Sequence, residues 1–234
     1  MTPAKATALL PAFAILAVAG AIAFAIPFDR ALGAITADNR LPRALALVTC
    51  GLAGLLLSSR IGATIGSRGL RRPFAAPLMI GAAVALLAAL IDAVLPRSIL
   101  VPGYIVYTTG TPLAIRVGVY CLRAFNEGVL YRLFLGGVFV WIFGRFWKAS
   151  DGLPTTGAVI AGMALAQAIN ILVNVVAAPG SALTPAFLLY AAVRFVAPGV
   201  LWGWLYVRHG FVANEIAAVS AQLFLQPMIG LIYS

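Results

Sequence analysis

The chain has 234 residues, of which 63% are hydrophobic and 9% charged, and its mean hydropathy is +1.05. Soluble domains carry about 25% charged residues, so this composition excludes a soluble protein and indicates an all-α, polytopic integral membrane protein. The net charge of +10 comes from Lys and Arg residues scattered between apolar runs, a pattern that excludes a nucleic-acid-binding surface. Cys50 and Cys121 lie in separate apolar segments and predict no disulfide framework.

Runs of about 20 apolar residues, the length that crosses a bilayer as a helix, occur along the whole chain. They predict seven spanning helices, over residues 7–27, 44–59, 74–95, 113–144, 155–177, 184–207 and 211–232. The first run is longer than the apolar core of a signal peptide, so we expect it to be retained as a helix. The fourth is longer than one straight span needs. The segment before it, 98–112, contains Pro102, Gly103, Gly110 and Pro112 and is predicted to be irregular or re-entrant.

The basic residues between the spans predict the orientation of the chain. With the N-terminus in the cytoplasm, the cytoplasmic side receives Lys5, Arg60, Arg68, Arg71, Arg72, Arg145, Lys148 and Arg208. The other side receives Arg30, Arg40, Arg43 and Arg97. Since cytoplasmic loops carry the excess of Lys and Arg, we expect a prokaryotic-type plasma (inner) membrane protein with a cytoplasmic N-terminus. The glycine-rich stretch 61–72 is then a basic connector that meets anionic headgroups.

Several charged residues fall within the apolar segments, where a charge is costly and marks a paired or functional position. They include Arg116, Arg123, Arg132, Arg194, Asp92 and Glu127. Asp92 lies near the end of its segment, and we expect it at the membrane interface, reaching headgroups or Arg97. Arg194 is expected to be the counter-ion of Glu127 or Asp92.

Polar residues on the later segments recur at helical spacing. Three faces are predicted: Gln167, Asn170 and Asn174; Glu215, Gln222 and Gln226; and Arg116, Arg123 and Glu127, with Arg132 pointing elsewhere. Side-chain amides have no partners among acyl chains, so these faces are expected to turn inward and line a polar interior. The alternative is that the amides only join helices through interhelical hydrogen bonds.

Three stretches that carry these polar residues resemble, in the same order along the chain, the motifs of the CPBP (Abi) family of CAAX prenyl endopeptidases and bacteriocin-processing membrane proteins. "EGVLYRLFLGG", residues 127–137, is similar to the EExxxR motif, with Gly128 in the place of the second glutamate. "MALAQAIN", residues 163–170, resembles FxxxH, with Met163 for the Phe and Gln167 for the His. "EIAAVSAQLFLQ", residues 215–226, resembles the last motif, with Gln222 for its His and Gln226 for its Asn or Asp.

The resemblance implies a CPBP-like bundle: one membrane domain in which residues 1–111 are N-terminal transmembrane helices and residues 112–234 are core helices. It implies an intramembrane peptidase, without cofactor, that acts at the lipid bilayer on a membrane peptide or a prenylated protein. Glu127 would activate water, Gln167 would position it, and Gln222 and Gln226 would stabilise the oxyanion. Arg132, Arg123 and Arg194 are expected to be structural or charge partners.

Two further hypotheses stay open. Glutamine cannot exchange a proton as histidine does, so the loss of both motif histidines also fits a catalytically inactive scaffold, a pseudoenzyme that binds a peptide. Buried arginines beside a carboxylate also occur in small transporters, although no inverted repeat is evident in the chain. Metal catalysis is not expected, because His209, the only histidine, lies in the turn "YVRHG" without a cluster of metal ligands.

Overall fold

The computed structural model describes residues 3–95, 99, 102–176 and 184–233. Within these ranges the chain is helical, apart from connecting segments and one isolated β-bridge between Lys148 and Pro154. In chain order the helices are α1 (Pro3–Ala25), α2 (Arg30–Ile35), α3 (Arg40–Ser58), η1 (Ser59–Ile61), α4 (Ala75–Val94), α5 (Pro102–Gly110), α6 (Leu113–Glu127), η3 (Gly128–Gly136), α7 (Gly137–Phe146), α8 (Thr156–Ile171), η4 (Leu172–Val176), α9 (Pro185–Ala191), η5 (Ala192–Val196), α10 (Ala197–His209) and α11 (Phe211–Tyr233).

Six continuous helices are long and apolar enough to cross a membrane, which agrees with the predicted all-α membrane bundle. They are Arg40–Ile61, Ala75–Val94, Leu113–Phe146, Thr156–Val176, Pro185–His209 and Phe211–Tyr233. α1 contains a shorter apolar stretch, Leu10–Ala25. Helices suit this environment because they satisfy their own backbone hydrogen bonds where no water is present.

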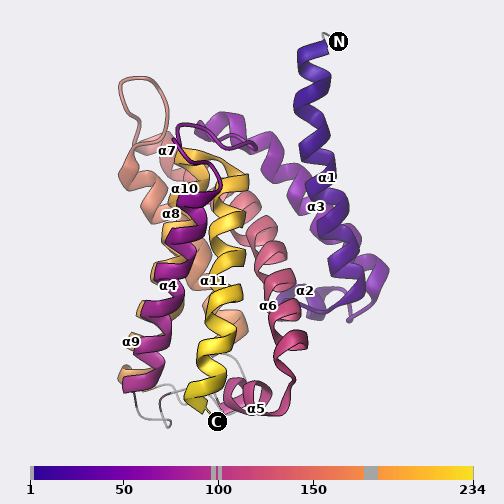
Figure 1. Cartoon of the computed structure of the whole chain (residues 1–234). Helices are drawn as coiled ribbons and strands as arrows, with labels where there is room; N and C mark the ends of the chain where they lie inside the picture. Colours follow the sequence, from indigo (N-terminus) through magenta and orange to yellow (C-terminus); the bar gives the residue numbers. More distant parts are fainter. Residues whose placement is uncertain (1–2, 96–98, 100–101, 177–183, 234) are drawn as a thin grey trace.

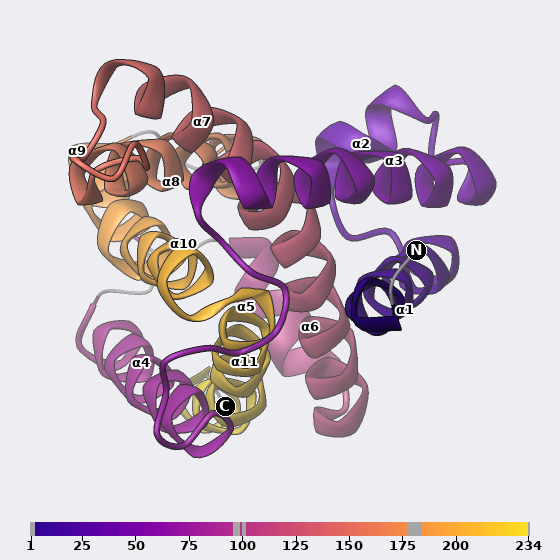
Figure 2. The ribbon, with the colours of Figure 1, turned by 90° about the horizontal axis from the view of Figure 1, so that it is seen from above.

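The long helices form a bundle in which the first turn of α1 and the last turn of α11 lie at opposite ends (Figure 1). Viewed along the bundle, α10 lies between α8 and α11, and α4 lies beside α11 (Figure 2). α1 and α3 form a pair to one side, where α3 packs against η3 (Figure 2). The later helices, which carry the polar faces, therefore enclose the interior of the bundle.

α4 packs along α11 at close range because small residues meet there. A Cβ at Gly81 would collide with the Ser220 hydroxyl and the Ala217 carbonyl. Small residues let helix backbones approach one another within a membrane. This contact ties the N-terminal part of the chain to the helix that carries Glu215, Gln222 and Gln226.

The helix from Leu113 to Phe146 changes its winding at the predicted site. α6 ends at Glu127, the π-helical segment η3 follows without a break, and α7 completes the 34-residue helix. In a π-helix each backbone N–H bonds to the carbonyl five residues earlier, so the side chains rotate out of α-helical register. Such turns are frequent at functional sites.

The expectation that residues 98–112 are irregular is wrong over residues 102–110, which form the helix α5. A proline is accommodated in the first turn of a helix, where its missing N–H has no intrahelical partner. α5 lies at the end of the bundle that also carries α2 and the last turn of α11 (Figure 1). Arg116, buried at the start of α6, donates to the carbonyls of Thr108 in α5 and of Gln226 in α11.

The connector after α3 is held to the turn between α10 and α11. The backbone N–H groups of Phe211 and Val212 donate to the carbonyls of Thr64 and Ile65, at 2.9 and 3.0 Å. The Arg68 N–H donates to the His209 carbonyl at 2.9 Å. The lone histidine, the last residue of α10, thus lies half-buried beside this connector.

Candidate functional site

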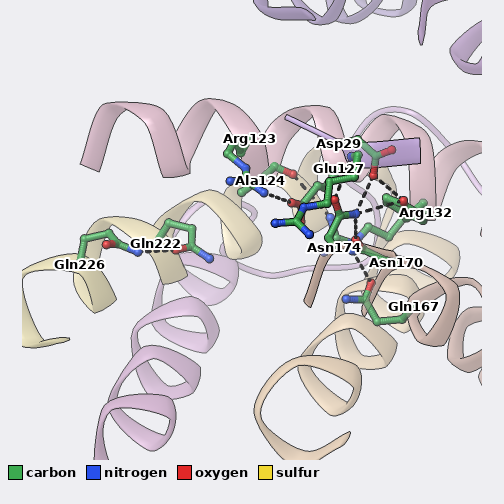
Figure 3. A network of polar contacts seen from close by, with 12 residues as sticks. Asp29, Arg123, Ala124, Glu127, Arg132, Gln167, Asn170, Asn174, Gln222 and Gln226 are labelled. Carbon is green, nitrogen blue, oxygen red and sulfur yellow. Dashed lines mark hydrogen bonds and ion pairs between the residues drawn. The ribbon is translucent and has the colours of Figure 1, made fainter. Parts of the chain in front are cut away.

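Glu127 is the last residue of α6 and faces the interior of the bundle with its side chain 22% exposed. Arg123, one helical turn earlier, forms an ion pair with it at 3.8 Å, as the spacing of four residues predicts. Figure 3 shows the two side chains with Arg132 and the amides of α8. Glu127 therefore does not face acyl chains.

The prediction that Arg132 points away from Glu127 is wrong. It assumed α-helical geometry, whereas residues 128–136 are π-helical, and the wider turns bring a side chain five residues later to the same side. Arg132 interacts electrostatically with Glu127, and both residues line one cavity. Its buried guanidinium donates a long hydrogen bond, 3.5 Å, to the Ala124 carbonyl.

The amide face that runs from α8 into η4 faces inward, as its spacing predicts. Asn174 Nδ2 donates to Asn170 Oδ1 at 3.0 Å, and Asn170 Nδ2 donates to Gln167 Oε1 at 3.5 Å. Gln167 Nε2 donates to the Phe195 carbonyl at 3.4 Å, and its side chain lies against Gly199, where a Cβ would collide with it. The three amides form one chain of hydrogen bonds (Figure 3).

Asp29 and Tyr131 extend this chain, and the sequence analysis missed both. Asn174 Nδ2 donates to Asp29 Oδ2 at 2.7 Å, and the Tyr131 hydroxyl donates to the same oxygen. Asp29 also caps the first turn of α2, where its Oδ1 accepts from the Leu32 N–H at 2.8 Å. The position of Asp29 directly before a short helix predicts that it caps this helix, but it does not predict the contacts with Tyr131 of η3 and Asn174 of η4.

Gln222 and Gln226 lie one turn apart on α11, and Gln226 Nε2 donates to Gln222 Oε1 at 3.0 Å. Figure 3 shows this pair on α11, apart from the α8 amides. Gln222 lines both cavities beside Glu127, whereas the fully buried Gln226 lines neither of these two. The structure thus brings Glu127, Gln167 and Gln222 to one cavity and places Gln226 behind Gln222.

Two adjoining cavities meet at Glu127. The smaller, of about 100 Å³, is lined by Glu127, Arg132, Gln167 and Gln222, among others. The larger, of about 720 Å³, is lined by Glu127, Gln222, several apolar residues and, among others, the following: Pro27, Arg30, Tyr104, Tyr107, Tyr120, Arg123, Asn170 and Asn174. A water molecule occupies about 30 Å³ of liquid, so the larger cavity has room for many waters or a peptide segment. Its lining reaches the end of the bundle that carries α2 and α5 (Figure 1).

The interpretation of Asp92 as an interfacial residue is wrong. Asp92 is buried and pairs with Arg194 at 3.0 Å, and the Tyr190 hydroxyl donates to it at 3.0 Å. An ion pair inside the bundle satisfies both charges where headgroups cannot reach. The expectation that Arg194 serves as a counter-ion is confirmed for Asp92, and the other expected partner, Arg97, lies outside the described residues.

Within the described ranges, no group of three or more His, Cys, Asp and Glu residues has the geometry to hold a metal ion. In comparisons with known proteins, no family model, no curated protein and no solved structure matches this chain. The site is therefore interpreted from its own geometry and from the order of its motifs.

Proposed function

We propose that the protein is a CPBP-like intramembrane endopeptidase that hydrolyses a peptide bond with a water molecule activated by Glu127. The observation that carries the proposal is the cavity of about 100 Å³ that Glu127, Gln167 and Gln222 line together. A carboxylate and two amides on the wall of one cavity within an apolar bundle supply a base and neutral hydrogen-bonding groups. The order of the three motifs along the chain supports the same assignment.

Glu127 acts as the general base. Its carboxylate accepts a proton from water while the water oxygen attacks the peptide carbonyl carbon, which gives a tetrahedral oxyanion. Glu127 then donates that proton to the amide nitrogen as the carbon–nitrogen bond breaks, so the carboxylate is regenerated. Gln167 positions the water, because its Oε1 keeps a lone pair beyond the one that accepts from Asn170.

Gln222 stabilises the oxyanion. Its Oε1 accepts from Gln226 Nε2, and its own Nε2 is then the group that donates to the oxyanion. Gln226 contributes by holding that orientation. An oxyanion donor of this kind contributes about 2.7 to 4 kcal/mol to transition-state stabilisation.

The substrate is a peptide segment at the membrane, such as a membrane peptide or the tail of a prenylated protein. It enters through the larger cavity. The apolar residues and tyrosines that line this cavity suit contact with a peptide segment. We assign the apolar part of α1 as a seventh span and place the N-terminus in the cytoplasm of a prokaryotic-type cell, by the distribution of Lys and Arg.

The test replaces Glu127 by Gln in the purified full chain and measures cleavage of a peptide library in detergent and in proteoliposomes. General acid–base catalysis contributes about 10²- to 10⁴-fold, so we expect cleavage to fall by that factor. Cys50→Ser, a change outside the cavity lining, is the control and should retain full cleavage. Equal cleavage by the native chain and Glu127→Gln would show that Glu127 is not the base.

A second candidate function is a peptide-binding scaffold without catalysis. The ion pair with Arg123, and Arg132 on the wall of the same cavity, favour it, because cations beside Glu127 compete with water for its carboxylate. Restoring the motif histidines with Gln167→His and Gln222→His separates the two functions. The double variant should gain cleavage if the native protein is a scaffold, and should lose it if the native site works with glutamines.

A further inference from the structure

Glu215, in the second turn of α11, is a buried acid to which the proposed mechanism gives no role. The residue is 7% exposed, and its Oε1 accepts from the neighbouring Asn214 Nδ2 at 2.6 Å. Its Oε2 is buried and has no hydrogen-bond partner among the described residues. A buried carboxylate with a vacant acceptor is costly unless a cation compensates its charge.

The Glu215 carboxyl group lies against Gly128, the first residue of η3. A Cβ built on Gly128 would collide with Oε1, and the Cδ and Oε2 atoms would also lie within 2.8 Å of it. Any side chain at position 128 therefore competes with the Glu215 carboxylate for one space. This is the position where the EExxxR motif places its second glutamate, and the structure fills it with a carboxylate from another helix.

Four charges alternate in sign from the larger cavity into the bundle. Arg123 pairs with Glu127, and Arg132 interacts electrostatically with both Glu127 and Glu215. Arg123 and Glu127 have side chains 31% and 22% exposed, whereas Arg132 and Glu215 are buried. The alternation balances two cations with two carboxylates, which is the condition for keeping charges in a low-dielectric interior.

We propose that Glu215 is the second carboxylate of the Glu127 site: a positioning residue that acts through Arg132 and occupies the space left by Gly128. The proposal rests on Glu127 being the base of the proposed function. Because Glu215 shares the positive charge of Arg132, Arg132 does not bind Glu127 alone, and the Glu127 carboxylate remains available to water. Gly128 is then required for space rather than for backbone flexibility.

A carboxylate exchange tests the placement. Gly128→Glu and Glu215→Gly are made singly and together in the full chain, and melting temperature and peptide cleavage are measured in detergent. We expect each single variant to melt several degrees lower, by crowding or by loss of the carboxylate, and the double variant to recover most of the loss. Gly118→Ala on α6, where a Cβ would contact no atom within 4 Å, is the control and should be unaffected. Additive losses in the double variant would overturn the shared position.

A chemical probe tests the action on Glu127 without any need for cleavage. Dicyclohexylcarbodiimide modifies protonated carboxyl groups in apolar surroundings, and mass spectrometry reports the rate at Glu127. We expect the rate to fall several-fold in Glu215→Gln, because Glu127 then keeps the full attraction of Arg132. Ser220→Ala, whose hydroxyl donates to the Ala217 carbonyl within the same helix, is the matched control. An unchanged rate in Glu215→Gln would overturn the proposal.

The two measurements separate failure of this inference from failure of the proposed function. If neither the native chain nor any variant cleaves peptides, the proposed hydrolytic function is wrong. Recovery of melting temperature in the exchange and slower labelling of Glu127 would still establish the charge relationship. If the native chain cleaves but the exchange is additive and the labelling is unchanged, hydrolysis stands and Glu215 has no part in it.

Discussion

Arg194 Nε lies 3.0 Å from Asp92 Oδ1, and Arg194 Nη2 lies 3.1 Å from Asp92 Oδ2, so a two-point ion pair joins η5 to α4. Both side chains are buried, and the Tyr190 hydroxyl completes the coordination of Asp92. The geometry matches the planar fork of a guanidinium to a carboxylate. The pair fixes the wall of the cavities that Arg194 lines, next to Glu127.

Removing one partner of this pair should destabilise the protein strongly. Arg194→Gln leaves Asp92 as an uncompensated buried charge, which costs about 3 to 5 kcal/mol in comparable sites. We expect Arg194→Gln to melt well below the native chain in detergent, as followed by circular dichroism. The double variant Asp92→Asn with Arg194→Gln should melt higher than Arg194→Gln alone, because no buried charge remains. A double variant that loses the sum of the single effects would contradict the pairing.

The positions of the spanning helices follow from the sequence because a bilayer demands long apolar runs, and six described helices fall where such runs occur. The amide face of α8 could also be predicted from the sequence. The helix is α-helical up to residue 171, so the expected spacing holds there, and the side-chain amides need hydrogen-bond partners inside the bundle. Both inferences use regular geometry, which a single sequence expresses directly.

The remaining parts of the site depend on irregular geometry or on partners distant in sequence. The π-helical turns after Glu127 direct Arg132 toward the cavity, and nothing in the sequence "GVLYR" predicts a π-helix. Asp29 reaches Tyr131 and Asn174 only through the packing of the α1–α2 turn against η3 and η4. Glu215 fills the space at Gly128 only because α11 crosses η3 at that residue.

The close contact of α4 and α11 gives a second prediction. Gly81→Val inserts a branched side chain where even a Cβ collides with the Ala217 carbonyl, and the helices must separate. Overpacking of this kind costs about 1 to 3 kcal/mol. We expect a lower melting temperature and weaker protection of α11 amides in hydrogen exchange. The same substitution at the open position Gly118 should change neither measurement, and an equal effect there would contradict the packing argument.

The hydroxyl of Tyr131 gives a third prediction. Tyr131→Phe removes the donor to Asp29 while keeping the ring, so Asp29 retains Asn174 and the Leu32 N–H as partners. A hydrogen bond to a charged group contributes about 1.5 to 3 kcal/mol, and we expect a loss in this range in the free energy of unfolding. Asp29→Asn removes the charge and also weakens the cap of α2. The effect of Tyr131→Phe should therefore be smaller in the Asp29→Asn background, and equal effects in both backgrounds would mean that the two groups do not interact.

The larger cavity gives the last prediction, since a hydrolytic site at Glu127 requires water to reach it. In a chain with Cys50→Ser and Cys121→Ser, Val119→Cys places a thiol on the wall of the cavity of about 720 Å³. A charged, membrane-impermeant thiol reagent should label it when added to the side of the membrane on which α2 and α5 lie, and not when added to the other side. Leu86→Cys, 53% exposed along α4, is the matched control: in a membrane-spanning helix it faces acyl chains and should stay unlabelled from either side. Labelling of Val119→Cys only from the side of the connector 61–72 would reverse the proposed access route. Absence of labelling from both sides would mean that the cavity is dry, and a water-activating role for Glu127 would then be untenable.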